Sequence, residues 1–136
     1  MVEQFVEYLG DLHCQLTHGP SKSTILTDAP VDNHGKGEYF SPTDLVSAAV
    51  GACILTVMAL VADRDGIEIE GTTIKVSKEM AAQPLRRIGK LTLDIKFPRK
   101  YEDKHFQILK NVIRTCPVVS SLNPEIEIVT NYSFKE

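Results

Sequence analysis

The stretch SPTDLVSAAVGAC, residues 41–53, predicts the first half of a long helix around which the other elements of the chain are ordered. Ser41 is a good N-cap, and Pro42 fits the first helical position because its fixed backbone suits a helix start. Asp44 lies three residues after the cap, as in a capping box with a shorter acid. We therefore expect a helix that starts at Pro42 and is capped by its own first turn.

The helix is expected to run to about Arg64, since Gly66 is a natural terminator. Ser47, Thr56 and the many alanines favour a buried helix over a membrane span. Small residues allow another backbone to come close, so we expect a second element, or the same helix of a partner chain, to pack against the middle of this one. The small residues concerned are Ala48, Ala49, Gly51 and Ala52.

The segments before the helix alternate loosely between apolar and polar residues and are separated by turn residues. They predict an antiparallel meander of three strands, followed by a polar loop over Asp28–Tyr39. The expected strands are Val2–Leu9, Leu12–Thr17 and Ser23–Thr27.

The segments after the helix predict a strand pair, two helices and a closing strand. The second strand is the clearest, because Leu91, Leu93, Ile95 and Phe97 all fall on one face. The order βββ-α-ββ-αα-β is of the α+β class, and we expect residues 1–136 to form a single domain. The expected elements are strands over Ile67–Ser77 and Ile88–Phe97, a helix over Glu102–Arg114, a short helix from Cys116-Pro117, and a strand over Glu125–Phe134.

Composition excludes several functional classes. The net charge is −3, and no basic stripe is interleaved with aromatic residues, which argues against a nucleic-acid binder. The first residues carry no basic region and no signal-like apolar run, so we expect a cytoplasmic protein that does not span a membrane. The chain has three cysteines. In a cytosolic protein these are catalytic, redox-active or metal-bound more often than they form a structural disulfide framework.

Two of the cysteines are candidate site residues, and each has two interpretations. Cys53 in an alanine-rich helix is either a small buried hydrophobe or a reactive thiol that needs a nearby cation. Cys116 precedes Pro117 and would be the N-cap of a helix, where backbone N–H groups stabilise a thiolate. The alternative is an inert cysteine under a helix end.

The third cysteine suggests a metal site only weakly. Cys14 lies beside His13, and His18 is near in sequence, but no second pair at ligand spacing supports a metal. We therefore predict neither a metal site nor a cofactor.

The motif of residues 41–53, together with Cys116-Pro117-Val118, closely resembles the OsmC/Ohr family of osmotically inducible and organic hydroperoxide resistance proteins. The resemblance covers essentially the whole chain, and it implies an OsmC-like domain that forms an intertwined homodimer. It further implies a cytoplasmic, cysteine-based peroxidase that acts on organic hydroperoxides in defence against oxidative stress. Cys53 would attack the peroxide and become a sulfenic acid, and Cys116 would resolve it as a disulfide. A dithiol reductant, of the lipoyl type in the Ohr branch, would restore both thiols.

The sequence departs from the peroxidase pattern at two places. The peroxidases have a Glu two positions after the helix N-cap, where this chain has Thr43, and they hold the thiolate with an Arg from the N-terminal half, where this chain has none before Arg64. Nine helical residues at about 100° each place Asp44 roughly opposite Cys53, so Asp44 is better explained as a cap. Candidate replacements for the cation are Lys22, His34, Lys36, Arg86 and Arg87.

These departures indicate a divergent, OsmC-like branch and leave two alternatives to the peroxidase. The first is a non-catalytic, stress-associated dimer that binds an apolar ligand. The second is a thiol redox sensor, which needs only a reversible disulfide between Cys53 and Cys116.

Overall fold

The computed structural model describes residues 1–135, which fall into two compact units: an N-terminal unit of residues 1–46 and a C-terminal unit from residue 47 onward. The element order βββ-α-ββ-αα-β confirms the predicted α+β class, with two short 3-10 turns added. The elements are β1 (Gln4–Gly10), β2 (His13–His18), β3 (Thr24–Asp28), η1 (Val31–Asn33), α1 (Pro42–Asp65), β4 (Thr73–Ala81), β5 (Arg87–Phe97), α2 (Asp103–Asn111), η2 (Val112–Thr115), α3 (Pro117–Ser121) and β6 (Glu127–Phe134).

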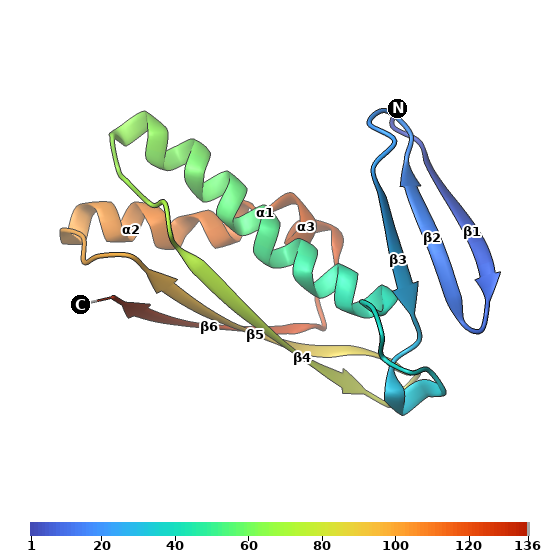
Figure 1. Ribbon diagram of the computed structural model, residues 1–136. Helices are drawn as coiled ribbons and strands as arrows, with labels where there is room; N and C mark the ends of the chain where they lie inside the picture. Colours follow the sequence, from blue (N-terminus) through green and yellow to red (C-terminus); the bar gives the residue numbers. More distant parts are fainter. Residues whose placement is uncertain (136) are drawn as a thin grey trace. The chain divides into compact units, whose positions relative to one another are not determined.

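The N-terminal unit is the predicted antiparallel meander, a three-stranded sheet in the order β1-β2-β3 (Figure 1). The turn between β1 and β2 is tight: Gly10, Asp11 and Leu12 all have positive φ. The pairing of β2 with β3 sets His13 directly opposite Asp28. The loop after β3 folds back on itself, and a Cβ at Gly35 would collide with the Ala29 carbonyl oxygen, so only glycine is accommodated there.

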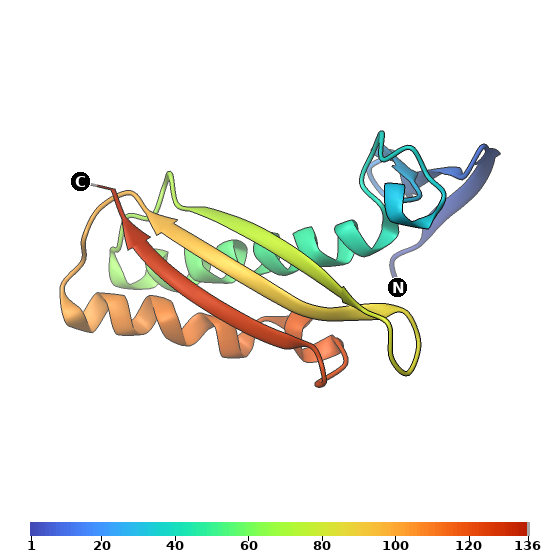
Figure 2. The same cartoon turned by 90° about the horizontal axis from the view of Figure 1, so that it is seen from below.

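The C-terminal unit is a second three-stranded sheet with helices on one face. Its central strand, β5, is antiparallel to β4 and parallel to β6. Helices α1 and α2 lie side by side on the same face of this sheet, as both views show (Figures 1 and 2). The parallel pairing of β5 with β6 requires the chain to cross over between them, and α2, η2 and α3 make that connection.

The core of the C-terminal unit lies between this sheet and its helices. The predicted inward face of β5 is buried. A stripe of α1 whose residues are four positions apart is buried as well. Phe97 has no exposed surface, and four aromatic rings surround it. Gly51 allows α1 to approach β4 closely, because a Cβ there would lie 3.1 Å from Cγ2 of Val76. The buried stripes are Leu91, Leu93, Ile95 and Phe97 on β5, and Val50, Ile54, Met58 and Ala62 on α1.

Helix α1 begins as the sequence predicts. The Asp44 amide donates to Ser41 Oγ at 3.0 Å, and the Ser41 amide donates to Asp44 Oδ2 at 3.0 Å, which is the reciprocal bonding of a capping box. Gly66, with φ of +66°, follows the last helical residue. Within residues 1–135, α1 is the one helix long and apolar enough to cross a membrane by length and composition, a test that core helices of soluble proteins also pass.

The strand predicted over Ile67–Ser77 is wrong at its start, since β4 begins at Thr73. The Thr72 amide donates to the Ile69 carbonyl at 3.0 Å, and Gly71 has φ of +93°, so this segment is a turn despite its alternating isoleucines. The strand extends to Ala81, four residues beyond its predicted end at Ser77. The helix predicted over Glu102–Arg114 is a regular α-helix only to Asn111, where the tighter η2 turn replaces it.

Candidate active site

Cys53 and Cys116 both belong to the C-terminal unit, where different helices position them. Cys53 lies on α1 next to Ile54 of the buried stripe, and its side chain is half-buried. Cys116 is fully buried and is the N-cap of α3, as predicted. Its sulfur accepts a hydrogen bond from the Val119 amide at 3.5 Å, which satisfies one of the free donors of the first helical turn.

The structure places the two thiols near enough for Cys53 to act on the ionisation of Cys116. All three cysteines are free thiols. Burial raises the pKa of Cys116. The Val119 amide acts in the opposite direction, and the interaction with Cys53 raises the pKa again. The predicted helix-end stabilisation of a Cys116 thiolate is therefore present but is outweighed by burial, so the group stays protonated.

Two of the side chains considered as replacements for the family's cation, Lys36 and Arg87, have other partners in the structure. Lys36 Nζ donates to Asp11 Oδ2 at 3.1 Å within the N-terminal unit. The Arg87 guanidinium donates to the carbonyl oxygens of Gln83 and Ile88 in its own hairpin. Neither of these contacts of Lys36 and Arg87 involves Cys53.

The residues that the sequence suggested for a metal site, Cys14, His13 and His18, are not brought together as one set of ligands in the described part of the chain. His18 Nδ1 lies 2.7 Å from Ser21 Oγ, and Cys14 is a free, half-buried thiol. In the described part of the chain, the one group with three potential metal ligands within 4.8 Å of one another is His13, Asp28 and Glu38. Sequence reasoning missed it, because it depends on the pairing of β2 with β3 and on the fold of the loop that follows.

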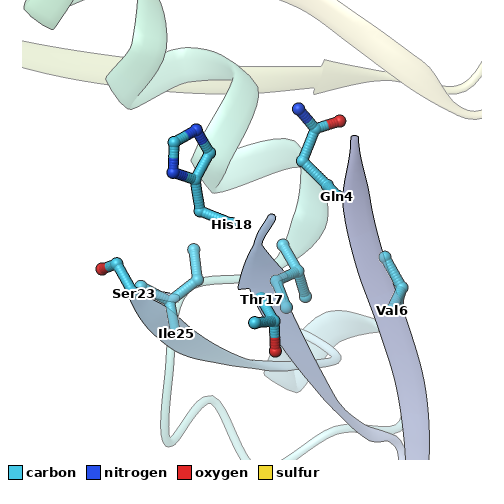
Figure 3. A pocket seen from close by; sticks show the side chains of 7 residues that line it. Gln4, Val6, Thr17, His18, Ser23 and Ile25 are labelled. Atoms are coloured by element: carbon cyan, nitrogen blue, oxygen red, sulfur yellow. The ribbon is translucent and has the colours of Figure 1, made fainter. Parts of the chain in front are cut away.

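A hollow of about 440 Å³ lies on one face of the N-terminal sheet (Figure 3). Its floor is formed by apolar side chains of all three strands, with polar groups at its edges. The lining residues are Gln4, Val6, Leu16, Thr17, His18, Ser23 and Ile25.

Comparisons with known proteins agree on the fold. The family model described as OsmC-like protein matches residues 35–131. A structure from Psychrobacter arcticus 273-4, of a protein named for osmotic stress induction and a detoxification response, is 42% identical to this chain. That match covers 97% of this chain and 96% of that chain, with a TM-score of 0.91. A search of the curated proteins finds no match.

More distant structures share the fold alone. An organic hydroperoxide resistance protein OsmC from Legionella pneumophila is 13% identical, with 100% of this chain and 97% of that chain covered and a TM-score of 0.78. The organic hydroperoxide resistance protein OhrB of Bacillus subtilis is 15% identical, with 97% of each chain covered and a TM-score of 0.73. These matches define an α+β protein of OsmC/Ohr architecture, as the sequence motifs imply. The chain belongs to the OsmC-like protein family.

Proposed function

We propose that this protein is a cysteine-based peroxidase that reduces organic hydroperoxides in defence against oxidative stress. The observation that carries the proposal is the proximity of Cys53 and Cys116, two thiols from distant parts of the sequence that interact electrostatically in the folded chain. The names of the relatives from Legionella pneumophila and Bacillus subtilis, both organic hydroperoxide resistance proteins, support the same substrate class.

In the proposed reaction the Cys53 thiolate attacks one oxygen of the hydroperoxide. A sulfur–oxygen bond forms, the O–O bond breaks, and the leaving oxygen takes a proton and departs as an alcohol. Cys53 is thereby oxidised to a sulfenic acid. The Cys116 thiol then displaces water and forms a disulfide with Cys53. A dithiol reductant of the lipoyl type returns both sulfurs to thiols by exchange through a mixed disulfide.

The environments of the two sulfurs favour this division of roles. A peroxide must reach the attacking sulfur, and Cys53 is the less buried of the two. Cys116 is buried with a raised pKa, so it stays a thiol until the sulfenic acid forms beside it. A disulfide between them would join two side chains that already interact in the reduced protein.

We also propose that the protein works as a homodimer in the cytoplasm, as one OsmC-like domain over residues 1–136. Helix α1 is apolar on all sides, yet only one stripe of it is buried, and Leu60 on another side is 62% exposed. The strands of the N-terminal sheet likewise expose large apolar residues, among them Phe5 and Tyr8. Apolar surface on this scale is typical of a protein–protein interface. The proposed reaction needs no cofactor, metal, nucleic acid or membrane.

The test is a stoichiometric titration of the fully reduced protein with cumene hydroperoxide and, separately, with hydrogen peroxide. We expect rapid loss of two thiols and a Cys53–Cys116 disulfide by mass spectrometry, with preference for the organic peroxide. Cys53→Ser should abolish peroxide consumption, whereas Cys116→Ser should allow one fast turnover and trap a sulfenic acid at Cys53. Cys14→Ser, the matched control, should react as the wild type does. Full activity of Cys53→Ser would refute the mechanism.

A thiol redox sensor would behave differently in the same titration. It would form the disulfide once but would not consume further peroxide when a dithiol such as dihydrolipoamide is supplied in excess. Continuous turnover with the dithiol therefore separates the enzyme from the sensor.

The hollow on the N-terminal sheet favours a second candidate, a dimer that binds an apolar ligand (Figure 3). A fluorescent fatty acid is a suitable probe. If binding carried the function, Leu16→Glu would abolish probe binding in a protein that shows no reaction with either peroxide. If the peroxidase proposal holds, peroxide consumption should not depend on the probe.

A further inference from the structure

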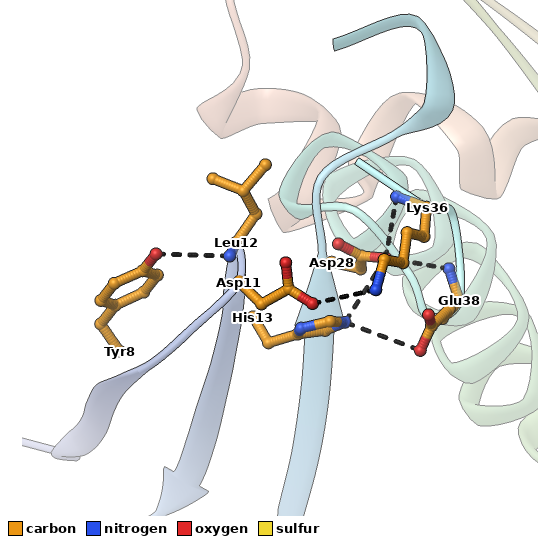
Figure 4. Close-up of polar contacts among 7 residues, drawn as sticks. All are labelled: Tyr8, Asp11, Leu12, His13, Asp28, Lys36 and Glu38. Carbon is orange, nitrogen blue, oxygen red and sulfur yellow. Dashed lines mark hydrogen bonds and ion pairs between the residues drawn. The ribbon is translucent and has the colours of Figure 1, made fainter. Parts of the chain in front are cut away.

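A compact cluster of one histidine and two carboxylates lies in the N-terminal unit, apart in sequence from Cys53 and Cys116 (Figure 4). His13 starts β2, and Asp28 ends β3 directly opposite it in the sheet. Glu38 comes from the loop that folds back over this edge. Their arrangement therefore depends on strand pairing and loop closure together.

The spacing of these side chains suits a small metal ion. His13 Nε2 lies 3.5 Å from Asp28 Oδ2 and 3.8 Å from Glu38 Oε2, and the three ligand atoms lie within 4.8 Å of one another. A tetrahedral zinc ion with bonds of about 2.0–2.1 Å separates its ligand atoms by about 3.3–3.4 Å. Small movements of Glu38, whose side chain is 49% exposed, would close the set to that geometry.

Two buried atoms in the cluster lack hydrogen-bond partners. Among the described residues, His13 Nε2 and Asp28 Oδ1 are the buried side-chain atoms left without one. Asp28 is 1% exposed, and its other oxygen, Oδ2, accepts the Lys36 and Glu38 amides at 3.3 and 3.1 Å. An unsatisfied buried polar atom is costly, and a cation held by the Asp28 carboxylate and by His13 Nε2 would satisfy both groups.

The local charge also favours a cation. Asp28 contributes one carboxylate to the cluster. Asp11 and Glu38 add two more carboxylates, and Lys36, paired with Asp11, supplies one ammonium group. Three negative charges and one positive charge leave about −2 before any ion binds.

We propose that His13, Asp28 and Glu38 bind a divalent transition-metal cation, with Zn²⁺ the best match to their spacing and donor types. One imidazole nitrogen and two carboxylate oxygens supply three ligands, and water takes the fourth position. The bound ion fastens the loop of residues 29–40 to the paired ends of β2 and β3. The site does not involve Cys53 or Cys116, so the metal-site proposal can be tested independently of the proposed peroxidase activity.

The test is isothermal titration of the chelator-treated, fully reduced protein with Zn²⁺, in parallel with thermal unfolding. The wild type should bind one equivalent at this site and melt at a higher temperature with the ion. His13→Gln and Glu38→Gln should each weaken that binding by at least about tenfold, since each removes one of three ligands. Glu38 is exposed, so its substitution leaves a folded protein. Mg²⁺ at the same concentration should not bind, because it prefers all-oxygen octahedral sites.

Three controls make the result specific. His105→Gln removes a histidine that lies 3.3 Å from Glu102 on α2 without a third ligand, and it should leave Zn²⁺ affinity unchanged. Cys14→Ser and Cys53→Ser should also retain the site, which distinguishes it from binding by the thiol beside His13 and by the thiol on α1. The proposal is overturned if the wild type shows no saturable Zn²⁺ binding, if His13→Gln and Glu38→Gln bind as the wild type does, or if Cys53→Ser abolishes binding.

Discussion

Gly51 of α1 and Val76 of β4 meet where the helix crosses the sheet, and a Cβ at Gly51 would lie 3.1 Å from the Val76 methyl group. The small residues in the middle of the helix therefore serve, at this position, a close approach to the chain's own sheet. Ala48 and Ala52 lie on exposed sides of the same helix and remain available to a partner. One cluster of small residues thus has members with different structural roles.

Enlarging Gly51 should destabilise the protein in proportion to the added volume. Gly51→Leu is expected to lower the free energy of unfolding by about 1–3 kcal/mol, because the side chain must push against Val76. Gly51→Ala should be close to neutral, since the gain in helix propensity of about 1 kcal/mol offsets a tight methyl contact. Urea unfolding of both variants checks that Gly51→Leu is less stable than Gly51→Ala. A Gly51→Leu protein as stable as the wild type would contradict the packing.

The aromatic cluster around Phe97 should be a main source of stability in the C-terminal unit. Phe97→Ala is expected to cost about 3–5 kcal/mol, because it leaves a cavity among four rings. Phe97→Leu should cost less and should keep the protein folded for measurement. The matched control is Leu85→Ala, whose side chain is 76% exposed in the β4–β5 loop and which should change stability by less than about 0.5 kcal/mol. If Phe97→Ala and Leu85→Ala lost the same free energy of unfolding, the aromatic cluster would not be a main source of stability.

The capping box of α1 predicts a moderate effect at Ser41. Ser41→Ala removes the acceptor of the Asp44 amide and should lower the free energy of unfolding by about 0.5–2 kcal/mol. Ser41→Thr retains a hydroxyl acceptor and should recover most of the loss. Chemical denaturation measures both variants, and a Ser41→Ala protein as stable as the wild type would contradict the capping role.

Cys116 should make stability fall with rising pH in the alkaline range. Burial raises the pKa of this thiol above its ordinary value of 9.0, so the folded protein retains a proton that the unfolded chain has lost. Between the unfolded and folded pKa values the unfolded state binds fewer protons, and stability declines as pH rises. Cys116→Ala should remove this part of the decline at pH values above about 9 under reducing conditions. Cys14→Ala should keep it, and an unchanged slope in Cys116→Ala would show that the thiol is not held protonated.

The sequence predicted those elements whose signal is local and strong. Helix α1 has its cap, its proline and its terminating glycine in the expected places, and β5 has a clean alternation that burial confirms. The start of β4 was missed because Ile67 and Ile69 alternate like a strand, whereas the turn at Gly71 ends that pattern before any partner strand is reached.

The candidate sites were harder to predict, because they depend on which elements become neighbours. The pairing of Cys53 with Cys116 was expected only from the family resemblance, since no local pattern brings residues so far apart together. The cluster of His13, Asp28 and Glu38 depends on a strand register and a loop closure that the sequence does not display. The raised pKa of Cys116 follows from burial under α3, which outweighs the helix-end effect visible in the sequence.

The parallel pairing of β5 with β6 has a consequence for synthesis on the ribosome. Residues 98–126 lie between the two strands, so the central strand can pair with β4 early but must wait for residues 127–134 to emerge before its other edge is covered. Until then this edge of β5 has unpaired backbone N–H and C=O groups, which can pair with a strand of another chain. A nascent chain paused within this interval is therefore the species most exposed to aggregation, and chaperone demand should peak there.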